Sequence, residues 1–180
     1  MVMGYQEVVK RYGSVYHINK AIGESKLFKI GRGIYSESST SSEIEIISAR
    51  YPQAIFTMDS AFYFHGLTDV IPTILHLSTR RNMLRIRNPR VRQYFEQEKS
   101  FGVGKINLSF NGISVPIYNK ERMLLELVRR QTELPFDYYK EIIRNYRQQV
   151  ESLDMEKLET YMEQIDRRMN YYRILQKEVF

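Results

Sequence analysis

The side chains with the clearest chemical potential are cations, and they gather in two stretches of the chain. Residues 1–36 hold six Lys or Arg against two Glu, and residues 80–92 hold six Arg and no acid. Residues 37–79 hold one Arg and five acids, whereas residues 93–180 hold fourteen charges of each sign. Segregated positive charge is typical of proteins that bind a polyanion such as nucleic acid. Evenly mixed charge is typical of a solvated surface.

The arginine tract of residues 80–92 is the denser of the two stretches. Guanidinium groups without neighbouring acids repel one another unless an anion joins them. The tract therefore predicts a second phosphate-binding surface or a docking surface for an acidic partner. An exposed loop kept soluble by its charge is the alternative. Its members are Arg80, Arg81, Arg85, Arg87, Arg90 and Arg92.

Patterns that would indicate catalysis or metal binding are missing from the sequence. It contains neither a phosphate-binding G-x-x-x-x-G-K-[ST] loop nor a G-x-S-x-G nucleophile elbow. Gly31-Arg32-Gly33 lacks the third glycine of a dinucleotide-binding fingerprint. An enzyme acting on nucleic acid would have to use dispersed acids such as Asp59 or Asp69. The three histidines lie in unlike sequence contexts, and none belongs to an H-E-x-x-H metal-binding pair. They are His17, His65 and His76. We therefore expect no enzymatic activity, no cofactor and no metal site.

Composition and the first residues also predict the cellular compartment of the chain. No window of about 18 consecutive residues is apolar, so we expect no membrane-spanning segment. The first residues, MVMGYQEVVKRYG, carry charges where a signal peptide needs an apolar stretch. The sequence contains no cysteine, which removes disulfides and thiolate metal sites. Together these features predict a cytoplasmic protein.

The elements that would position the first group of cations are two short helices. Tyr5, Val8, Val9 and Tyr12 fall on one stripe of a helix over residues 5–12. Glycine at position 13 ends it, and Ser14 can cap a second helix. The apolar residues 15, 18 and 22 are predicted on the inward side of that second helix.

A basic hairpin is predicted to follow these helices. Two β-prone stretches flank Gly31-Arg32-Gly33, which favours a tight turn. Helix, glycine, helix and hairpin is the order of a compact winged helix-turn-helix, in which the second helix enters the DNA major groove. The alternative is a short helix that displays polar residues to solvent. The candidate DNA contacts are His17, Asn19, Lys20, Lys26, Lys29 and Arg32.

The fold class expected for the whole chain is α+β. The run SESSTSS at 36–42 resembles a linker, so the predicted domains are a winged helix-turn-helix at 1–38 and a mixed α/β domain at 39–180. Strands are predicted at 54–57 and 73–77 with a helix over 61–65. Asn111-Gly112 between alternating runs predicts a β-hairpin. A C-terminal helical bundle is predicted after residue 119.

Three segments resemble the AbiEi family of antitoxins in their order and spacing. They are LFKIGRGIYS, AIFTMDSAFYFHGL and VPIYNKERMLLELVRRQTELPFDYYKEIIRNYR. The resemblance implies an N-terminal winged helix that binds inverted repeats in its own promoter and represses transcription. It implies a C-terminal domain that counteracts a nucleotidyltransferase-like toxin, without requiring a tight complex. The chain departs from the family by having two helices before the hairpin rather than three.

A second interpretation stays open beside the antitoxin and autorepressor. The chain could be an interaction protein that does not bind DNA. Its arginine tract would then bind an acidic protein or RNA.

Overall fold

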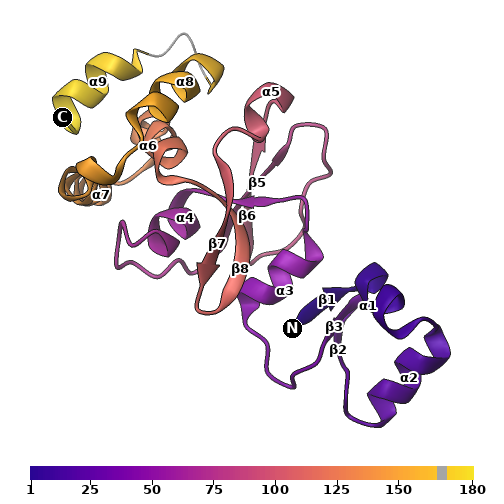
Figure 1. The fold of residues 1–180 in the computed structure, drawn as a ribbon. Coiled ribbons are helices and arrows are strands. Elements are labelled where there is room, and N and C mark those ends of the chain that lie inside the picture. The colour runs from indigo at the N-terminus through magenta and orange to yellow at the C-terminus, as the bar shows by residue number, and fades with distance from the viewer. Residues whose placement is uncertain (166–169) are drawn as a thin grey trace. The chain divides into compact units, whose positions relative to one another are not determined.

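The computed structural model describes residues 1–165 and 170–180. The chain forms two compact units, Met1–Gln53 and Ala54–Phe180, and each combines helices with a β-sheet (Figure 1). This confirms the α+β class predicted from the sequence. The residue pattern placed the division after residue 38, whereas residues 39–53 belong to the first unit. Within the described ranges, no helix has the length and apolarity that crossing a bilayer requires.

The first unit is a three-stranded antiparallel sheet with three helices. The two predicted helices and the predicted hairpin are present, and strand β1, which the pattern did not indicate, pairs with β3. The sheet order is β1-β3-β2, so β2 lies at an edge. The elements are β1 (Val2–Gly4), α1 (Tyr5–Tyr12), α2 (Val15–Gly23), β2 (Phe28–Gly31), β3 (Ile34–Ser36) and α3 (Glu43–Arg50).

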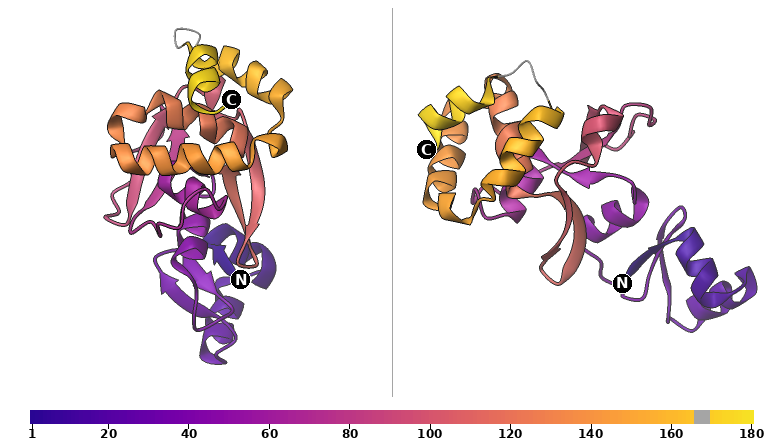
Figure 2. Two further views of the ribbon diagram at one scale, coloured as in Figure 1. Left: turned by 90° about the vertical axis from the view of Figure 1, so that its left-hand side faces the viewer. Right: turned by 45° about the horizontal axis from the view of Figure 1, so that its top comes forward.

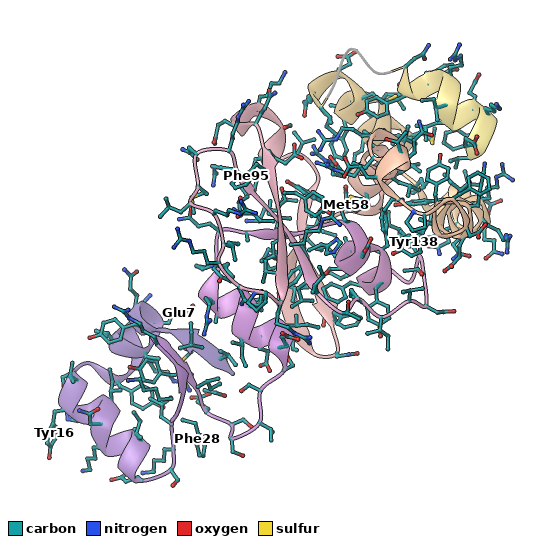
Figure 3. The ribbon with its side chains drawn as sticks, turned by 180° about the vertical axis from the view of Figure 1, so that it is seen from behind. Glu7, Tyr16, Phe28, Met58, Phe95 and Tyr138 are labelled. Atoms are coloured by element: carbon teal, nitrogen blue, oxygen red, sulfur yellow. The ribbon has the colours of Figure 1, made fainter. Side chains whose placement is uncertain are left out.

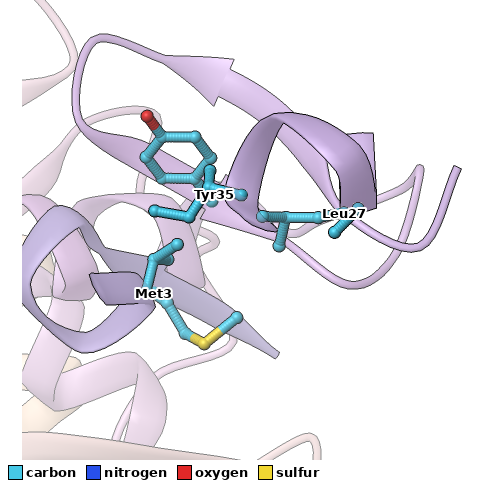
Figure 4. Packing of buried hydrophobic residues seen from close by; sticks show 6 residues of the cluster. Met3, Leu27 and Tyr35 are labelled. Carbon is cyan, nitrogen blue, oxygen red and sulfur yellow. The ribbon is translucent and has the colours of Figure 1, made fainter. Parts of the chain in front are cut away.

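A small apolar core holds these elements together. Figure 4 shows Met3 of β1, Tyr35 of β3, and Leu27, which directly precedes β2, gathered in this core. Val8 of α1 and Ile18 of α2 complete the contacts between helices and sheet. Because every element up to β3 except the edge strand β2 contributes to this one cluster, burial of apolar surface fixes how α2 and the hairpin are presented.

Helix α3 explains the position of the boundary. Ser42 caps it in a capping box, accepting from the Glu45 N–H while the Glu45 carboxylate accepts from the Ser42 N–H. The helix contacts β1 and β3, and its Ile47 is buried. The serine-rich run therefore lies inside the first unit rather than between the two.

The second unit contains a five-stranded mixed sheet in the order β6-β5-β4-β8-β7. The pairs β4/β8 and β5/β6 are parallel, and β4/β5 and β7/β8 are antiparallel. The Asn111-Gly112 hairpin is confirmed, since both residues have positive φ and join β7 to β8. The strands are β4 (Ile55–Phe56), β5 (Leu75–Arg80), β6 (Val91–Glu96), β7 (Lys105–Phe110) and β8 (Ile113–Tyr118).

Helices cover one side of this sheet. Figures 1 and 2 show α4 and α6 to α9 gathered there, and α6 contacts α4, α8 and α9. The apolar face predicted for α6 is buried, including Met123, Leu124 and Leu127. The helices are α4 (Met58–Phe64), α5 (Glu98–Phe101), α6 (Lys120–Arg129), α7 (Phe136–Gln148), α8 (Met155–Ile165) and α9 (Tyr171–Glu178).

Helix α6 also buries charge, which the sequence pattern did not indicate. Arg122 has no exposed surface, and its guanidinium lies 2.7 Å from Glu126 Oε1 and 3.5 Å from Glu96 Oε2. Its Nη1 donates to the Ser100 carbonyl oxygen at 3.0 Å. Arg129 bridges the same two carboxylates. Burial acts to raise the pKa of Glu126. The neighbouring guanidiniums outweigh this effect and hold that pKa below its ordinary value.

Removing one partner of this network should destabilise the second unit strongly. Glu126→Gln leaves the buried Arg122 charge without its nearest carboxylate, so we expect a loss of about 3–5 kcal/mol in unfolding free energy. Urea unfolding followed by circular dichroism measures it. The control is Glu133→Gln, which removes an exposed partner of Arg130 and should cost less than about 1 kcal/mol. Equal losses in the two variants would contradict a structural role for the buried pair.

Candidate nucleic-acid interface

Helix α2 presents a polar face away from the core. Ser14 caps it by accepting from the His17 N–H at 3.4 Å, and Ser14 Oγ also lies 3.0 Å from His17 Nδ1. Ile18 and Ala21 are buried against the core, which fixes the rotation of the helix. His17, Asn19 and Lys20 are therefore exposed, as the helical period predicts.

The first turn of α2 differs from the prediction. Val15, predicted on the inward side, is 57% exposed, because the core cluster of this unit does not extend to the first residue of the helix. Tyr16, labelled in Figure 3, is 72% exposed. Its ring meets the His17 ring edge-on, with 5.5 Å between the ring centroids. Tyr16 thus adds an aromatic side chain to the exposed face, and the sequence analysis had not included it.

The hairpin β2–β3 carries the next candidates. Lys29 lies on the edge strand β2, and Arg32 lies in the turn beside Gly33, whose φ of +71° suits glycine. Both cations are exposed. Among the carboxylates of the described residues, none forms an ion pair with Lys29 or Arg32. These two positive charges therefore have no counterion in the described part of the chain.

Two further candidates share one acid. Glu24 Oε2 lies 2.7 Å from Lys26 Nζ, and its Oε1 lies 3.9 Å from Lys20 Nζ. The hydrogen bond to Glu24 raises the pKa of Lys26. Glu24 offsets one of these two charges, so the net positive charge of this region rests mainly on Lys29 and Arg32.

The arginine tract begins with Arg80 at the end of β5 and ends with Arg92 on β6, and its other four arginines lie in the loop between these strands. The parallel register pairs His76 with Arg92 and Arg80 with Glu96. At roughly 3.3 Å per residue, Arg80 and Arg92 are on the order of 13 Å apart along the strands. Arg80 also donates to Glu98 at 2.9 Å and lies 4.6 Å from the Phe101 ring centroid. These contacts within the second unit make Arg80 a weak candidate for binding a phosphate.

The loop between β5 and β6 is bonded to β6. Gln93 Oε1 accepts from the Ile86 N–H at 2.7 Å, and Gln93 Nε2 donates to the Leu84 carbonyl oxygen at 3.2 Å. Arg81, Arg85 and Arg87 are exposed, and no described carboxylate forms an ion pair with them. These three arginines are therefore exposed to solvent on a loop that Gln93 holds against β6.

Asp59, His76 and Tyr94 form a polar cluster next to Arg92 of the tract, and the sequence did not predict it. His76 Nε2 is 3.7 Å from Asp59 Oδ2, and its Nδ1 is 3.3 Å from the Tyr94 hydroxyl. The guanidiniums of Arg92 and Arg130 lie over the Tyr94 ring at 5.4 and 4.8 Å. The parallel β5/β6 pairing places His76 near Tyr94, and Asp59 reaches His76 from α4. Strand β6 was not predicted. No residue pattern therefore linked the three side chains.

Burial decides the protonation of this cluster. It lowers the pKa of His76, against the opposing effect of Asp59, and it raises the pKa of Tyr94 to about 12. At neutral pH the imidazole is uncharged and the phenol is protonated. Within the described ranges, no three His, Asp or Glu side chains are placed to hold a metal ion.

No protein-family model matches the chain, and no curated protein is detectably similar to it in sequence. The resemblance to the AbiEi antitoxins therefore rests on the three sequence segments alone.

The buried histidine should make stability depend on pH. Below the ordinary histidine pKa of 6.5, the unfolded chain takes up a proton that folded His76 resists, so stability falls as the pH is lowered. We expect His76→Asn to lose less unfolding free energy than the wild type between about pH 7.5 and about pH 5.5. Urea unfolding at both pH values measures this.

The matched control for this experiment is His17→Asn, which changes an exposed histidine. It should keep the pH dependence of the wild type. If His76→Asn and the wild type lose the same unfolding free energy over this range, the protonation state assigned to His76 is wrong.

Proposed function

We propose that the first unit binds duplex DNA as a winged helix and that the chain is an antitoxin and autorepressor of the AbiEi type. The order α1, Gly13, α2 and hairpin supports the winged-helix interpretation, and β1 completes a small sheet with the hairpin. In this arrangement α2 is the recognition helix and β2–β3 is the wing.

The dimensions and side chains of α2 suit a major groove. An α-helix with its side chains is about 10–12 Å in diameter, and the major groove is about 12 Å wide. Asn19 can bond adenine bidentately, and Lys20 can contact guanine or a phosphate. His17 and Tyr16 lie on the same exposed segment and extend the surface available to the sugar–phosphate backbone.

The observation that carries the proposal is the uncompensated charge on the hairpin. Lys29 and Arg32 are exposed on one short hairpin without an ion pair in the described part of the chain. Phosphates would neutralise both and release condensed counterions, which is the main source of non-specific DNA affinity. Arginine at the turn is also the residue type favoured in a narrow minor groove.

The second unit supplies the antitoxin part of the proposal. By the AbiEi resemblance, it counteracts a nucleotidyltransferase-like toxin, with its C-terminal helices as a bundle and Arg81, Arg85 and Arg87 as a further phosphate-binding surface. The neighbouring reading frames test this part. The proposal expects a nucleotidyltransferase-like gene beside this one, and its absence would argue against the antitoxin assignment.

One observation favours the second candidate function, an acidic protein partner. Leu84 is 90% exposed and Met83 is 40% exposed in the arginine loop. Exposed apolar side chains among arginines are more typical of a protein interface than of a phosphate-binding surface. Reversal of the hairpin charges would leave such a partner bound.

The DNA-binding proposal is tested with a hairpin variant. Lys29→Glu/Arg32→Glu should weaken binding to the DNA upstream of the gene by more than about tenfold. It should also reduce the slope of log K against log salt by roughly two, since two phosphate contacts are lost. Fluorescence anisotropy over a salt series measures both quantities.

The control carries the same charge change on another element. Arg173→Glu/Lys177→Glu reverses two exposed cations on α9 and should keep near-wild-type affinity. Unchanged binding by the hairpin variant, or equal losses in both variants, would contradict DNA recognition by the first unit.

A further inference from the structure

The first turn of α2 places an apolar side chain on the exposed surface of the first unit. Val15 is the first residue of the helix and is 57% exposed, whereas Ile18 and Ala21 of the same helix are buried in the core cluster. Single exposed apolar residues are common on protein surfaces, so exposure alone assigns no role to Val15. Its neighbours on the helix decide what it can contact.

Asn19 is the neighbour of Val15 one turn further along α2. Residues four apart lie on the same side of an α-helix, with about 5–6 Å between their Cβ atoms. Both side chains are exposed, so they form one strip of surface, the Val15/Asn19 strip. His17 falls on the opposite side of the helix from Val15, because two residues advance an α-helix by about 200°. Its Nδ1 lies 3.0 Å from Ser14 Oγ. The strip therefore joins one apolar side chain to one amide.

The charge around this strip favours a nucleic acid over a protein as its partner. Lys20 follows Asn19 in the chain and is exposed. Lys29 and Arg32 of the same unit form no ion pair with a described carboxylate. The cores of protein–protein interfaces are depleted in lysine, whereas the DNA backbone attracts it. The inference below rests on the proposed function, in which α2 is the recognition helix and its N-terminal residues contact base edges.

Thymine offers the apolar group that a valine can contact in the major groove. Its C5-methyl projects into that groove, and its partner adenine presents N6 and N7, which an asparagine can bond bidentately. Successive base pairs are stacked about 3.4 Å apart, so side chains about 5–6 Å apart can reach the same base pair or adjacent ones. A valine in a helix keeps one dominant rotamer, so this contact costs little side-chain entropy.

We propose that Val15 packs against the C5-methyl of a thymine while Asn19 bonds an adenine in the same or the adjacent base pair. The first unit thereby selects its DNA by an apolar contact as well as by hydrogen bonds, and Val15 is a specificity-determining residue. The methyl contact uses neither Lys29 nor Arg32. It can therefore fail while DNA binding through the hairpin holds.

Removal of the thymine methyl groups tests this contact. The DNA upstream of the gene is prepared with thymidine or with deoxyuridine throughout, because deoxyuridine lacks only the C5-methyl. We expect the full wild-type chain to bind the deoxyuridine duplex at least roughly threefold more weakly, which is the factor expected for burial of one methyl-sized group. Fluorescence anisotropy at constant salt measures both affinities.

A variant at Val15 assigns the methyl effect to this residue. Val15→Ser removes two methyl groups from an exposed position outside the core cluster, so it should fold normally. It should bind the thymidine duplex at least about threefold more weakly than the wild type does, and it should bind the two duplexes equally. The matched control is Val70→Ser, which changes a valine of the second unit that is 53% exposed. It should behave as the wild type does on both duplexes.

The outcomes separate the methyl contact from DNA binding itself. Equal binding of the two duplexes by the wild type overturns the methyl contact. A deoxyuridine effect that Val15→Ser retains also overturns it, since the effect then comes from DNA shape or from another residue. If Val15→Ser lowers self-association in sedimentation and weakens both duplexes by the same factor, the strip contacts a second copy of the chain and the proposal is wrong. Failure of the wild type to bind either duplex at low salt refutes the proposed function as well.

Discussion

The structure of the second unit depends on the burial of one positive charge. Arg122 has no exposed surface, and a guanidinium removed from water must be matched by nearby carboxylates and acceptors. Glu96 comes from β6, Ser100 from α5 and Glu126 from α6, so these elements converge on the same group. The backbone follows the same constraint. Gly104 has a φ of +77°, and a Cβ at this position would lie only 2.5 Å from the Arg122 Cβ. Glycine is therefore required where the backbone passes Arg122.

Fixing Glu96 in this network also fixes β6 as the edge strand beside β5, and β6 leads out of the arginine tract. The cations of the molecule are thereby sorted into two kinds. Arg122 and Arg129 form ion pairs with Glu96 and Glu126, and Arg80 forms one with Glu98. The charges of these arginines are therefore neutralised within the second unit. Lys29, Arg32 and Arg85 have no acid partner in the described part of the chain. Total charge therefore overstates the surface that is available to a polyanion, and pairing determines where such a surface can lie.

Features set by neighbours in sequence were predictable. The Ser14 cap, the Asn111-Gly112 turn and the apolar stripe of α6 each follow from residues a few positions apart. Features set by distant partners were not. Strand β6 has the sequence VRQYFE and follows directly on the arginine tract, and it was not predicted. The arginines that neutralise its Glu96 stand about thirty residues later on α6, so no local pattern could show that this carboxylate is buried. The domain boundary was placed early because a serine-rich run resembles a linker, whereas α3 buries Ile47 against the first unit. The candidate DNA contacts were named from local period. The pairing of Lys20 and Lys26 with Glu24 is also local and could have been read from the sequence, but it was not predicted.

Amide hydrogen exchange of the full chain, with and without the DNA upstream of its gene, is the most direct test of DNA binding by the first unit. Contact through α2 and the wing should slow exchange across Val15–Gly23 and Phe28–Ser36 and leave α9 unchanged. Slowed exchange confined to the second unit, or no change on adding DNA at low salt, would contradict DNA recognition by α2 and the β2–β3 hairpin.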